Sequence, residues 1–255
     1  KGALQIANSK NVFAHDFHIK DYDCKGVTIT SGTGGTVEQI HVSSFSVTNC
    51  NEQAVIVDAT GGTARRVTIS NFTVYDHNHA GIAVNDGATD VAISNAVIDC
   101  NTAVFDAVSI RNAKRVSVTN IIGRRARNGL YLLYDIAPCE DIVVSACVFD
   151  SNQQDGVLVL SALRSTFTNV ICKNNNQGAG GGAGFNIAKS TNGGAPECSF
   201  ITVANCLAVD DQGTKTQQYG YFISAAPTNI MISGCSADGN VLGATSIAAT
   251  VAVGE

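Results

Sequence analysis

The sequence contains no tryptophan and only three prolines, and aromatic residues of all kinds make up 6% of its 255 positions. Charged residues are also scarce, at 15%, and their balance is acidic, with a net charge of −5. Proteins that track nucleic-acid phosphates are usually basic, so this class is disfavoured. No apolar run approaches the roughly 18 residues of a membrane-spanning helix, and no basic segment followed by an apolar core indicates a signal peptide. We therefore expect neither a nucleic acid nor a membrane as partner.

Metal-site spacing is missing as well. There are nine cysteines, but no C-x-x-C pair occurs, and no cysteines and histidines are spaced as zinc ligands. The odd count leaves at least one cysteine unpaired within the chain. We expect most of them to be small buried apolar residues, and Cys139 with Cys198 is the one disulfide pairing that we consider.

What the sequence does contain is a repeat. The segment VTISNFTV at 67–74 recurs as VAISNAVI at 91–98 and VSVTNIIG at 116–123. The remaining copies start at about 23- to 29-residue intervals, with one longer interval of about 36, and occupy 12–19, 40–47, 142–149, 165–172, 201–208 and 230–237. A second strand follows nearly every copy and reads small, apolar, any, apolar, as in GIAV at 81–84. Alternating apolar residues indicate strands with one buried face.

One such coil cannot bury its own apolar face, but coils stacked at about 4.8 Å bury a continuous core. The sequence therefore predicts an all-β fold, a right-handed, single-stranded parallel β-helix of about nine coils, forming one domain over residues 1–255. One internal aliphatic ladder is expected to contain Ile69, Ile93, Val118, Val144, Phe167, Val203 and Ile232. A polar ladder at a tight turn is expected to contain Asn71, Asn95, Asn120, Asn169 and Asn205. The glycine before the second strand suggests a bend with positive φ.

Other folds fit less well. A TIM barrel or Rossmann fold needs amphipathic helices between its strands, and a leucine-rich repeat needs L-x-x-L-x-L spacing; neither pattern occurs. The glycine-rich excursions at 173–184 and 190–199 are read either as flexible loops or as a lid or groove wall. Both chain ends look unfinished for a solenoid, so we expect a fragment of a larger protein or a partner subunit over an end.

Residues 11 to about 243 resemble the pectate-lyase-like superfamily of β-helix proteins, which includes polysaccharide lyases, hydrolases, alginate epimerases and phage tailspike depolymerases. The resemblance rests on N-F-x-V followed by G-I-x-V, and on DDQGTKTQQYGYFI at 210–223. It implies a polysaccharide as substrate or ligand, a secreted, extracellular or virion-associated location and, for a tailspike, a homotrimer. The epimerase motif D-P-H-E is absent, and only Asp210–Asp211 and HNHAG at 77–81 echo hydrolase motifs, so no catalytic residue is carried over.

Stacking nevertheless predicts a site. The segments before the second strands of coils three to six are rich in acids, histidines and arginines, which stacking places on one flank. The expected catalytic residues are His79, Asp106, Arg127, Tyr131 and Asp155. The expected substrate-binding residues are His77, Arg111, Arg124, Arg125, Tyr134 and Asp135.

Two chemistries fit these residues. Arginine can neutralise a sugar carboxylate, after which a histidine or tyrosine acts as base or acid in β-elimination. Alternatively Asp106 and Asp155, about 10 Å apart in backbone, form the carboxylate pair of an inverting glycosidase. We favour an enzyme, a polysaccharide lyase or glycoside hydrolase, with an epimerase as a further option. The alternative is a non-catalytic glycan-binding or structural module of a tailspike or adhesin.

Each site residue also has a structural interpretation, as a turn cap, a backbone acceptor or an ordinary surface group. The three arginines at 124, 125 and 127 must face anionic neighbours or an anionic ligand, because like charges so close together repel. Asp210 and Asp211 could supply oxygen ligands to calcium, which stays open as an alternative, but no nonapeptide calcium repeat is present, so we expect no cofactor and no metal.

Overall fold

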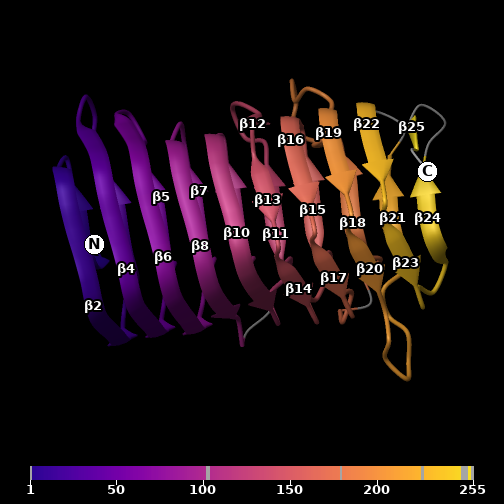
Figure 1. Cartoon of the computed structure of the whole chain (residues 1–255). Helices are drawn as coiled ribbons and strands as arrows, with labels where there is room; N and C mark the ends of the chain where they lie inside the picture. Colours follow the sequence, from indigo (N-terminus) through magenta and orange to yellow (C-terminus); the bar gives the residue numbers. More distant parts are fainter. Residues whose placement is uncertain (1, 102–103, 179, 225–226, 248–251, 254–255) are drawn as a thin grey trace.

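The chain winds into a solenoid whose strands run in parallel in two long sheets (Figure 1). The computed structural model describes residues 2–101, 104–178, 180–224, 227–247 and 252–253. Within these residues every regular element is a strand, and no helix is long and apolar enough to cross a membrane. The predicted all-β parallel solenoid is therefore confirmed.

Sheet A contains one short strand from each coil, stacked along the axis. In spatial order its strands are β1 (Gly2–Ala7), β3 (Lys25–Thr30), β5 (Val55–Asp58), β7 (Ile82–Asn85), β9 (Val108–Arg111), β11 (Leu130–Leu133), β15 (Val157–Leu160), β18 (Ala183–Ala188), β21 (Tyr219–Ile223) and β24 (Gly243–Ile247).

Sheet B contains one long, bent strand in each of the earlier coils. In the later coils this strand is divided into two or more short strands. Its main path is β2 (Lys10–Tyr22), β4 (Thr36–Cys50), β6 (Thr63–His77), β8 (Thr89–Asp99), β10 (Lys114–Arg124), β12 (Cys139–Glu140), β16 (Ala162–Thr168), β19 (Ser199–Ala204), β22 (Thr228–Ser233) and β25 (Ala252–Val253). The pieces beside this path are β13 (Val143–Ser145), β14 (Val148–Asp150), β17 (Ile171–Lys173), β20 (Leu207–Val209) and β23 (Ser236–Asp238).

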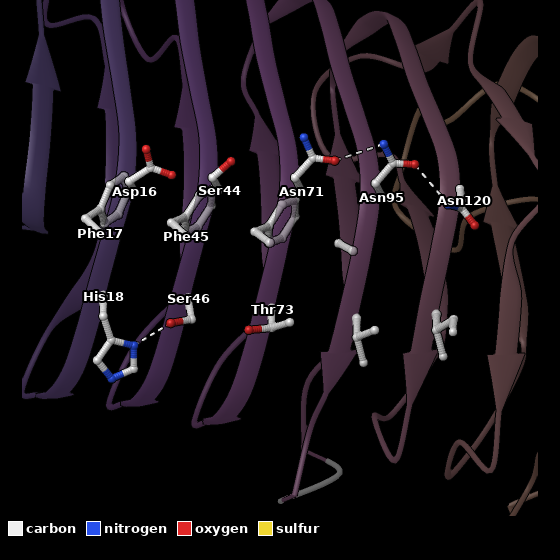
Figure 2. A pocket seen from close by; sticks show the side chains of 14 residues that line it. Asp16, Phe17, His18, Ser44, Phe45, Ser46, Asn71, Thr73, Asn95 and Asn120 are labelled. Carbon is white, nitrogen blue, oxygen red and sulfur yellow. Dashed lines mark hydrogen bonds between the residues drawn. The ribbon is translucent and has the colours of Figure 1, made fainter.

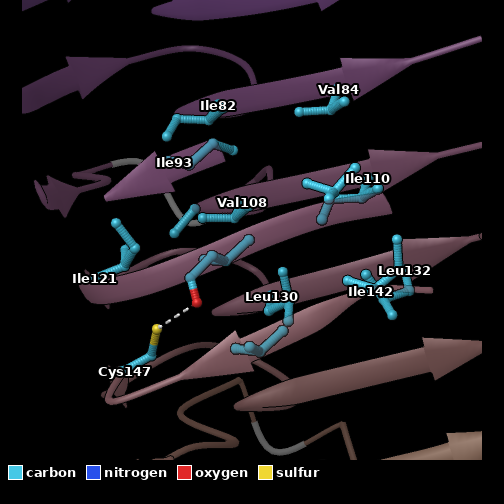
Figure 3. Close-up of a cluster of buried hydrophobic side chains, with 14 of the residues drawn as sticks. Ile82, Val84, Ile93, Val108, Ile110, Ile121, Leu130, Leu132, Ile142 and Cys147 are labelled. Carbon is cyan, nitrogen blue, oxygen red and sulfur yellow. Dashed lines mark hydrogen bonds between the residues drawn. The ribbon is translucent and has the colours of Figure 1, made fainter. Parts of the chain in front are cut away.

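The core lies between the two sheets and is filled by aliphatic residues that repeat from coil to coil. The predicted aliphatic ladder is confirmed, since Ile69 pairs in register with Ile93, Ile93 with Val118, and the ladder continues to Ile232. Figure 3 shows sheet A residues such as Ile82 and Val108 facing Ile93 and Ile121 of sheet B. Each fully buried side chain of this size contributes about 1.5–3 kcal/mol through the hydrophobic effect, so the stack stabilises every coil.

The bend in each sheet B strand is made by one residue in the left-handed conformation. Asn71, Asn95 and Asn120 all have φ of 55°, and asparagine tolerates this region better than most residues. Asn95 Nδ2 donates to Asn71 Oδ1 at 3.1 Å, and Asn120 Nδ2 donates to Asn95 Oδ1 at 2.9 Å. The predicted asparagine ladder is thus confirmed for these three residues. Asn169 and Asn205 also adopt the left-handed conformation, but Ala146 separates them from Asn120.

A second left-handed ladder, at the start of the same strands, was not predicted. It alternates in charge through Arg66, Asp90, Arg115, Asp141 and Arg164. Arg115 Nε lies 2.6 Å from Asp90 Oδ1, and Arg164 Nε lies 2.8 Å from Asp141 Oδ1. These ion pairs link successive coils at the surface, where each contributes little on its own.

The glycines before the sheet A strands do not adopt positive φ, so that prediction was wrong. Glycine is found at these positions because the coils pack closely against one another. A Cβ atom on Gly129 would lie 2.5 Å from the Gly156 carbonyl oxygen and 2.5 Å from the Phe149 Cβ. Side-chain atoms do not approach so closely, and glycine is therefore required here by space.

All nine cysteines are free thiols, so the disulfide considered between Cys139 and Cys198 does not form. Most are buried, as predicted, and Cys147 and Cys206 lie fully inside the core near the bend of their coils. Burial raises the pKa of the Cys147 thiol to about 11, which keeps it protonated and unreactive at neutral pH.

Candidate functional site

A pocket of about 280 Å³ opens on the outer face of sheet A, across strands β7, β9 and β11. We call it the sheet A pocket. Five of the predicted site residues line it, namely His79, Asp106, Arg111, Arg127 and Tyr131. The other lining residues are Gln53, Ala80, Ala83, Asn85, Phe105, Ser109 and Leu133. They come together because Ala83, Ser109 and Tyr131 occupy matching outward positions of neighbouring strands.

Asp106 and Arg127 form a two-pronged ion pair at one side of the pocket. Arg127 Nη2 lies 2.7 Å from Asp106 Oδ2, and Arg127 Nε lies 3.1 Å from Asp106 Oδ1. Asn128 Nδ2 donates to the same carboxylate at 2.8 Å. Burial lowers the pKa of Arg127, but the hydrogen bond and charge of Asp106 outweigh this effect and raise it. The Arg127 guanidinium therefore stays charged at neutral pH and pairs with the Asp106 carboxylate.

Tyr131 lies under this ion pair, with the Arg127 guanidinium carbon 5.6 Å from the centre of its ring. Burial, and then the negative charge of Asp106, raise the pKa of Tyr131, whereas Arg127 lowers it. The phenol consequently stays protonated at neutral pH and can donate a proton. On another wall, the His79 ring stacks on Phe105 with the ring centres 4.2 Å apart, which fixes the plane of the imidazole.

Arg111 supplies the remaining charge of the pocket. Its Nη2 lies 2.9 Å from Asp86 Oδ2, and its Nη1 lies 3.8 Å from Asp135 Oδ2. Its Nε is buried and has no hydrogen-bond partner within the described part of the chain. A buried donor without a partner costs free energy, while the rest of the guanidinium remains partly exposed to the pocket.

Asp155 does not line the sheet A pocket, although it occupies the same ladder as Asp106 two coils away. It is 5% exposed, and accepts hydrogen bonds from the Ala183 backbone N–H at 2.7 Å and from Asn186 Nδ2 at 3.2 Å. Burial raises the pKa of Asp155 to about 6, while these two hydrogen bonds lower it. Its position is that of a backbone acceptor inside the coil corner.

His77 also turns inward. It is 1% exposed, its Nδ1 contacts the His79 carbonyl oxygen, and its Nε2 lies 3.0 Å from Cys100 Sγ. Burial lowers the pKa of His77, so the ring is neutral at physiological pH. The structure places this residue within the wall of the solenoid, away from any ligand that the sheet A pocket could hold.

Arg124 and Arg125 lie at the coil corner outside the pocket. Arg124 Nε lies 2.9 Å from Asp99 Oδ2, and Arg125 Nε lies 2.6 Å from Asp99 Oδ1. The anionic neighbour that the arginine triplet required is therefore the buried Asp99, together with Asp106. Tyr134 is buried, and Asp135 remains half exposed beside Arg111.

Comparison with known proteins identifies the fold family. The model of a family described as "Right handed beta helix region" matches residues 2–194 and 104–253. The chain belongs to this family. The predicted right-handed parallel β-helix is thereby confirmed, and no curated protein matches the chain.

Several solved structures resemble this β-helix protein. The A-module of mannuronan C-5 epimerase AlgE6 from Azotobacter vinelandii is 12% identical with a TM-score of 0.58, over 99% of this chain and 75% of that one. The AlgE4 A-module from the same organism is also 12% identical, with a TM-score of 0.52 over 96% and 91% of the two chains. The pre-mature gene product 12 of bacteriophage phi29 is 14% identical, with a TM-score of 0.54 over 96% and 39%. At these identities the likeness concerns the fold alone.

One glycine-rich excursion of the β-helix protein reaches towards the pocket. In the loop between β18 and β19, Asn192 Nδ2 donates to the Tyr134 carbonyl oxygen at 3.0 Å. Tyr134 follows strand β11, whose Leu133 and Tyr131 line the pocket. No residue of 190–199 lines the pocket, so this contact does not decide between a flexible loop and a groove wall.

The residues considered for calcium are already engaged. Asp210 accepts hydrogen bonds from the backbone N–H groups of Gln212, Thr216 and Gln217, and Asp211 lies 3.0 Å from Lys173 Nζ. Among the described residues, no group of three or more histidines, cysteines and acids could hold a metal ion.

Two residues of the site were not predicted. Phe105, which orients His79, precedes Asp106 directly, and its aromatic character was the only signal. Asn128 holds Asp106 from the next coil, and the register of that coil could have identified it.

Proposed function

We propose that the sheet A pocket binds an acidic polysaccharide and moves a proton at the sugar carbon that bears the carboxylate. This step is shared by β-elimination and by C-5 epimerisation of uronates. The observation that carries the proposal is that His79, Arg111, Arg127 and Tyr131, from different coils, line one pocket. A cationic group, a base and an acid are what such a reaction requires.

The roles follow from the contacts. The partly exposed guanidinium of Arg111 binds the sugar carboxylate, which makes the neighbouring C–H more acidic. His79 removes that proton as the base. The electron pair then either expels the glycosidic oxygen at C-4, which takes the Tyr131 proton, or recovers a proton from Tyr131 on the opposite face. The first outcome is elimination and the second is epimerisation.

Hydrolysis by Asp106 and Asp155 fits the geometry less well. A carboxylate pair in an inverting glycosidase must face the same glycosidic bond. Asp155 is buried beneath Ala183 and Asn186, and Asp106 is held by Arg127 and Asn128. The names of the two Azotobacter proteins, mannuronan C-5 epimerases, make mannuronan the first substrate to test.

The test is incubation with a panel of uronate polysaccharides, including mannuronan, in deuterated water. Proton NMR reports deuterium at C-5, and ultraviolet absorbance reports the double bond left by elimination. We expect Tyr131→Phe to lower turnover by about 10²- to 10⁴-fold, the usual contribution of a general acid. Tyr75→Phe, on an exposed tyrosine of sheet B, is the matched control. Absence of both signals from a correctly folded chain, on every panel member, would contradict the proposal.

A second candidate is a glycan-binding module without catalysis. It is favoured by the charge balance of the pocket, since Arg127 pairs with Asp106 and Arg111 with Asp86. Saturable binding on a glycan array without deuterium exchange, unchanged in Tyr131→Phe, would select it. As part of a tailspike or adhesin the protein would act outside a cell or on a virion, and sedimentation would test for the homotrimer.

A further inference from the structure

A larger groove, of about 730 Å³, runs along the outside of sheet B across the first five coils (Figure 2). We call it the sheet B groove. It shares no lining residue with the sheet A pocket. Its lining residues are Asp16, Phe17, His18, Ser44, Phe45, Ser46, Asn71, Phe72, Thr73, Asn95, Ala96, Val97, Asn120 and Ile122.

The groove results from the left-handed bend in each strand. Asn71 and Thr73 point outward on either side of Phe72, whose ring is buried in the core. Because neighbouring coils are in register, the same arrangement of an outward, an inward and an outward side chain recurs from β2 to β10. Two rows of outward side chains therefore flank a recessed line that runs parallel to the solenoid axis.

At the later end of the groove, one wall is the amide ladder of Asn71, Asn95 and Asn120, which has spare hydrogen-bonding capacity. An asparagine amide has two N–H donors and two acceptor lone pairs. Asn95 uses one N–H towards Asn71 and one lone pair towards Asn120. A donor and an acceptor remain on the Asn95 side chain, which is exposed. The ladder can therefore form paired hydrogen bonds with an amide group of a ligand.

The facing wall changes character along the axis. Its first members are His18, Ser46 and Thr73, and its last are Val97 and Ile122. Ile122 is 39% exposed and pairs in register with Val97, so two aliphatic side chains adjoin on this wall. At the later end of the groove, amide groups thus face aliphatic groups across the recessed line.

No lysine or arginine lines the groove. Of its lining residues only Asp16 and His18 are ionisable, and both lie at the earlier end. Asp16 pairs with His15 at 2.8 Å, and His18 contacts Ser46. An acidic polymer would find no lysine or arginine to pair with in this groove, whereas an uncharged ligand needs no such partner.

We propose that the sheet B groove binds a neutral glycan that carries N-acetylated sugars, with its chain along the solenoid axis. The acetamide N–H and carbonyl pair with Asn95 and Asn120, and the acetamide methyl group packs on Val97 and Ile122. This site is separate from the one proposed on sheet A and does not depend on its activity.

The test is calorimetric titration of the whole chain with three tetrasaccharides: β-1,4-linked N-acetylglucosamine, cellotetraose and a mannuronate tetramer. We expect saturable binding of the first, with at least about tenfold weaker binding of the other two. Val97→Glu fills the later end of the groove with a charge and should weaken binding about tenfold or more. Ala92→Glu, at an outward position of the same strand β8 outside the groove, is the matched control and should bind like the wild type.

Asn95→Gly keeps the left-handed bend but removes the amide, and should weaken binding about fivefold, as expected for one hydrogen bond. Equal binding of cellotetraose would overturn the acetamide assignment, and unchanged binding in Val97→Glu would overturn the location. Loss of binding in Tyr131→Phe would place the sugar in the sheet A pocket and overturn the proposal as well. Retained binding in that variant, whatever its turnover of uronates, supports it.

Discussion

Replacing Asp155 with asparagine should stabilise the protein at neutral pH. The carboxyl group is almost completely buried, and its pKa of about 6 lies above the value of 3.8 that it has when exposed. Burial is the main cause, since the charged form loses its hydration. In Asp155→Asn the side-chain oxygen can still accept the Ala183 N–H. Once the Asn186 amide turns over, the new amide can donate to Asn186 Oδ1, which is buried without a partner in the described structure.

The size of the effect follows from linkage. Because the folded pKa is raised, the folded state binds the proton more tightly than the unfolded state. The stability contributed by protonated Asp155 is fully present below about pH 3.8 and is lost as the pH rises to about 6. A difference of about two pKa units corresponds to about 3 kcal/mol. Asparagine resembles the protonated acid and carries no charge, so the variant should avoid this loss.

The measurement is urea denaturation of the wild type and of Asp155→Asn between pH 4 and pH 8. The difference in the free energy of unfolding should be near zero at pH 4 and should grow to about 3 kcal/mol, in favour of the variant, by pH 7. Other carboxylates titrate in both proteins and cancel in the difference. A difference that stays constant with pH would refute the reasoning. Unchanged uronate turnover in the same variant would also show that Asp155 is not catalytic.

Two further substitutions test the contacts between coils. Gly129→Ala would push a methyl group against Phe149 and should lower the free energy of unfolding by about 1–3 kcal/mol or more. The control Gly193→Ala meets open space and should change the free energy of unfolding by less than about 0.5 kcal/mol, as measured by chemical denaturation. Arg115→Ala removes an exposed ion pair with Asp90 and should lower the melting temperature slightly, at low salt only. A loss that persists in high salt would contradict a purely ionic role for Arg115.

The sequence predicted the register of the solenoid because strand alternation and coil spacing are both periodic. Ile69 and Ile93, or Asn71 and Asn95, hold equivalent positions in the repeat, and stacking leaves no other arrangement for them. The same alternation of inward and outward side chains predicted that Tyr131 lies on the outer face of sheet A. Periodicity therefore predicts the fold and the outward strand positions of the pocket, such as Tyr131.

The corners between strands could not be predicted in this way. A left-handed residue interrupts the alternation of inward and outward side chains, so the direction of the residues beside it does not follow from the repeat. His77 and Asp155 were expected to face a ligand, and both turn inward: His77 directly follows the left-handed Asp76, and Asp155 lies in the bend before β15. The pairing of Arg124 and Arg125 with Asp99 also depends on side-chain rotamers, which one sequence does not determine.

The stacked coils set the distances between surface features in fixed increments. Residues of one coil pair only with those of the coil before and the coil after, so a whole turn of chain could be duplicated or removed without altering the pairing pattern elsewhere. A gain of one turn between two surface sites would move them apart by about 4.8 Å along the rod, and no smaller change is available. The solenoid can therefore be lengthened, by evolution or by design, only in whole turns.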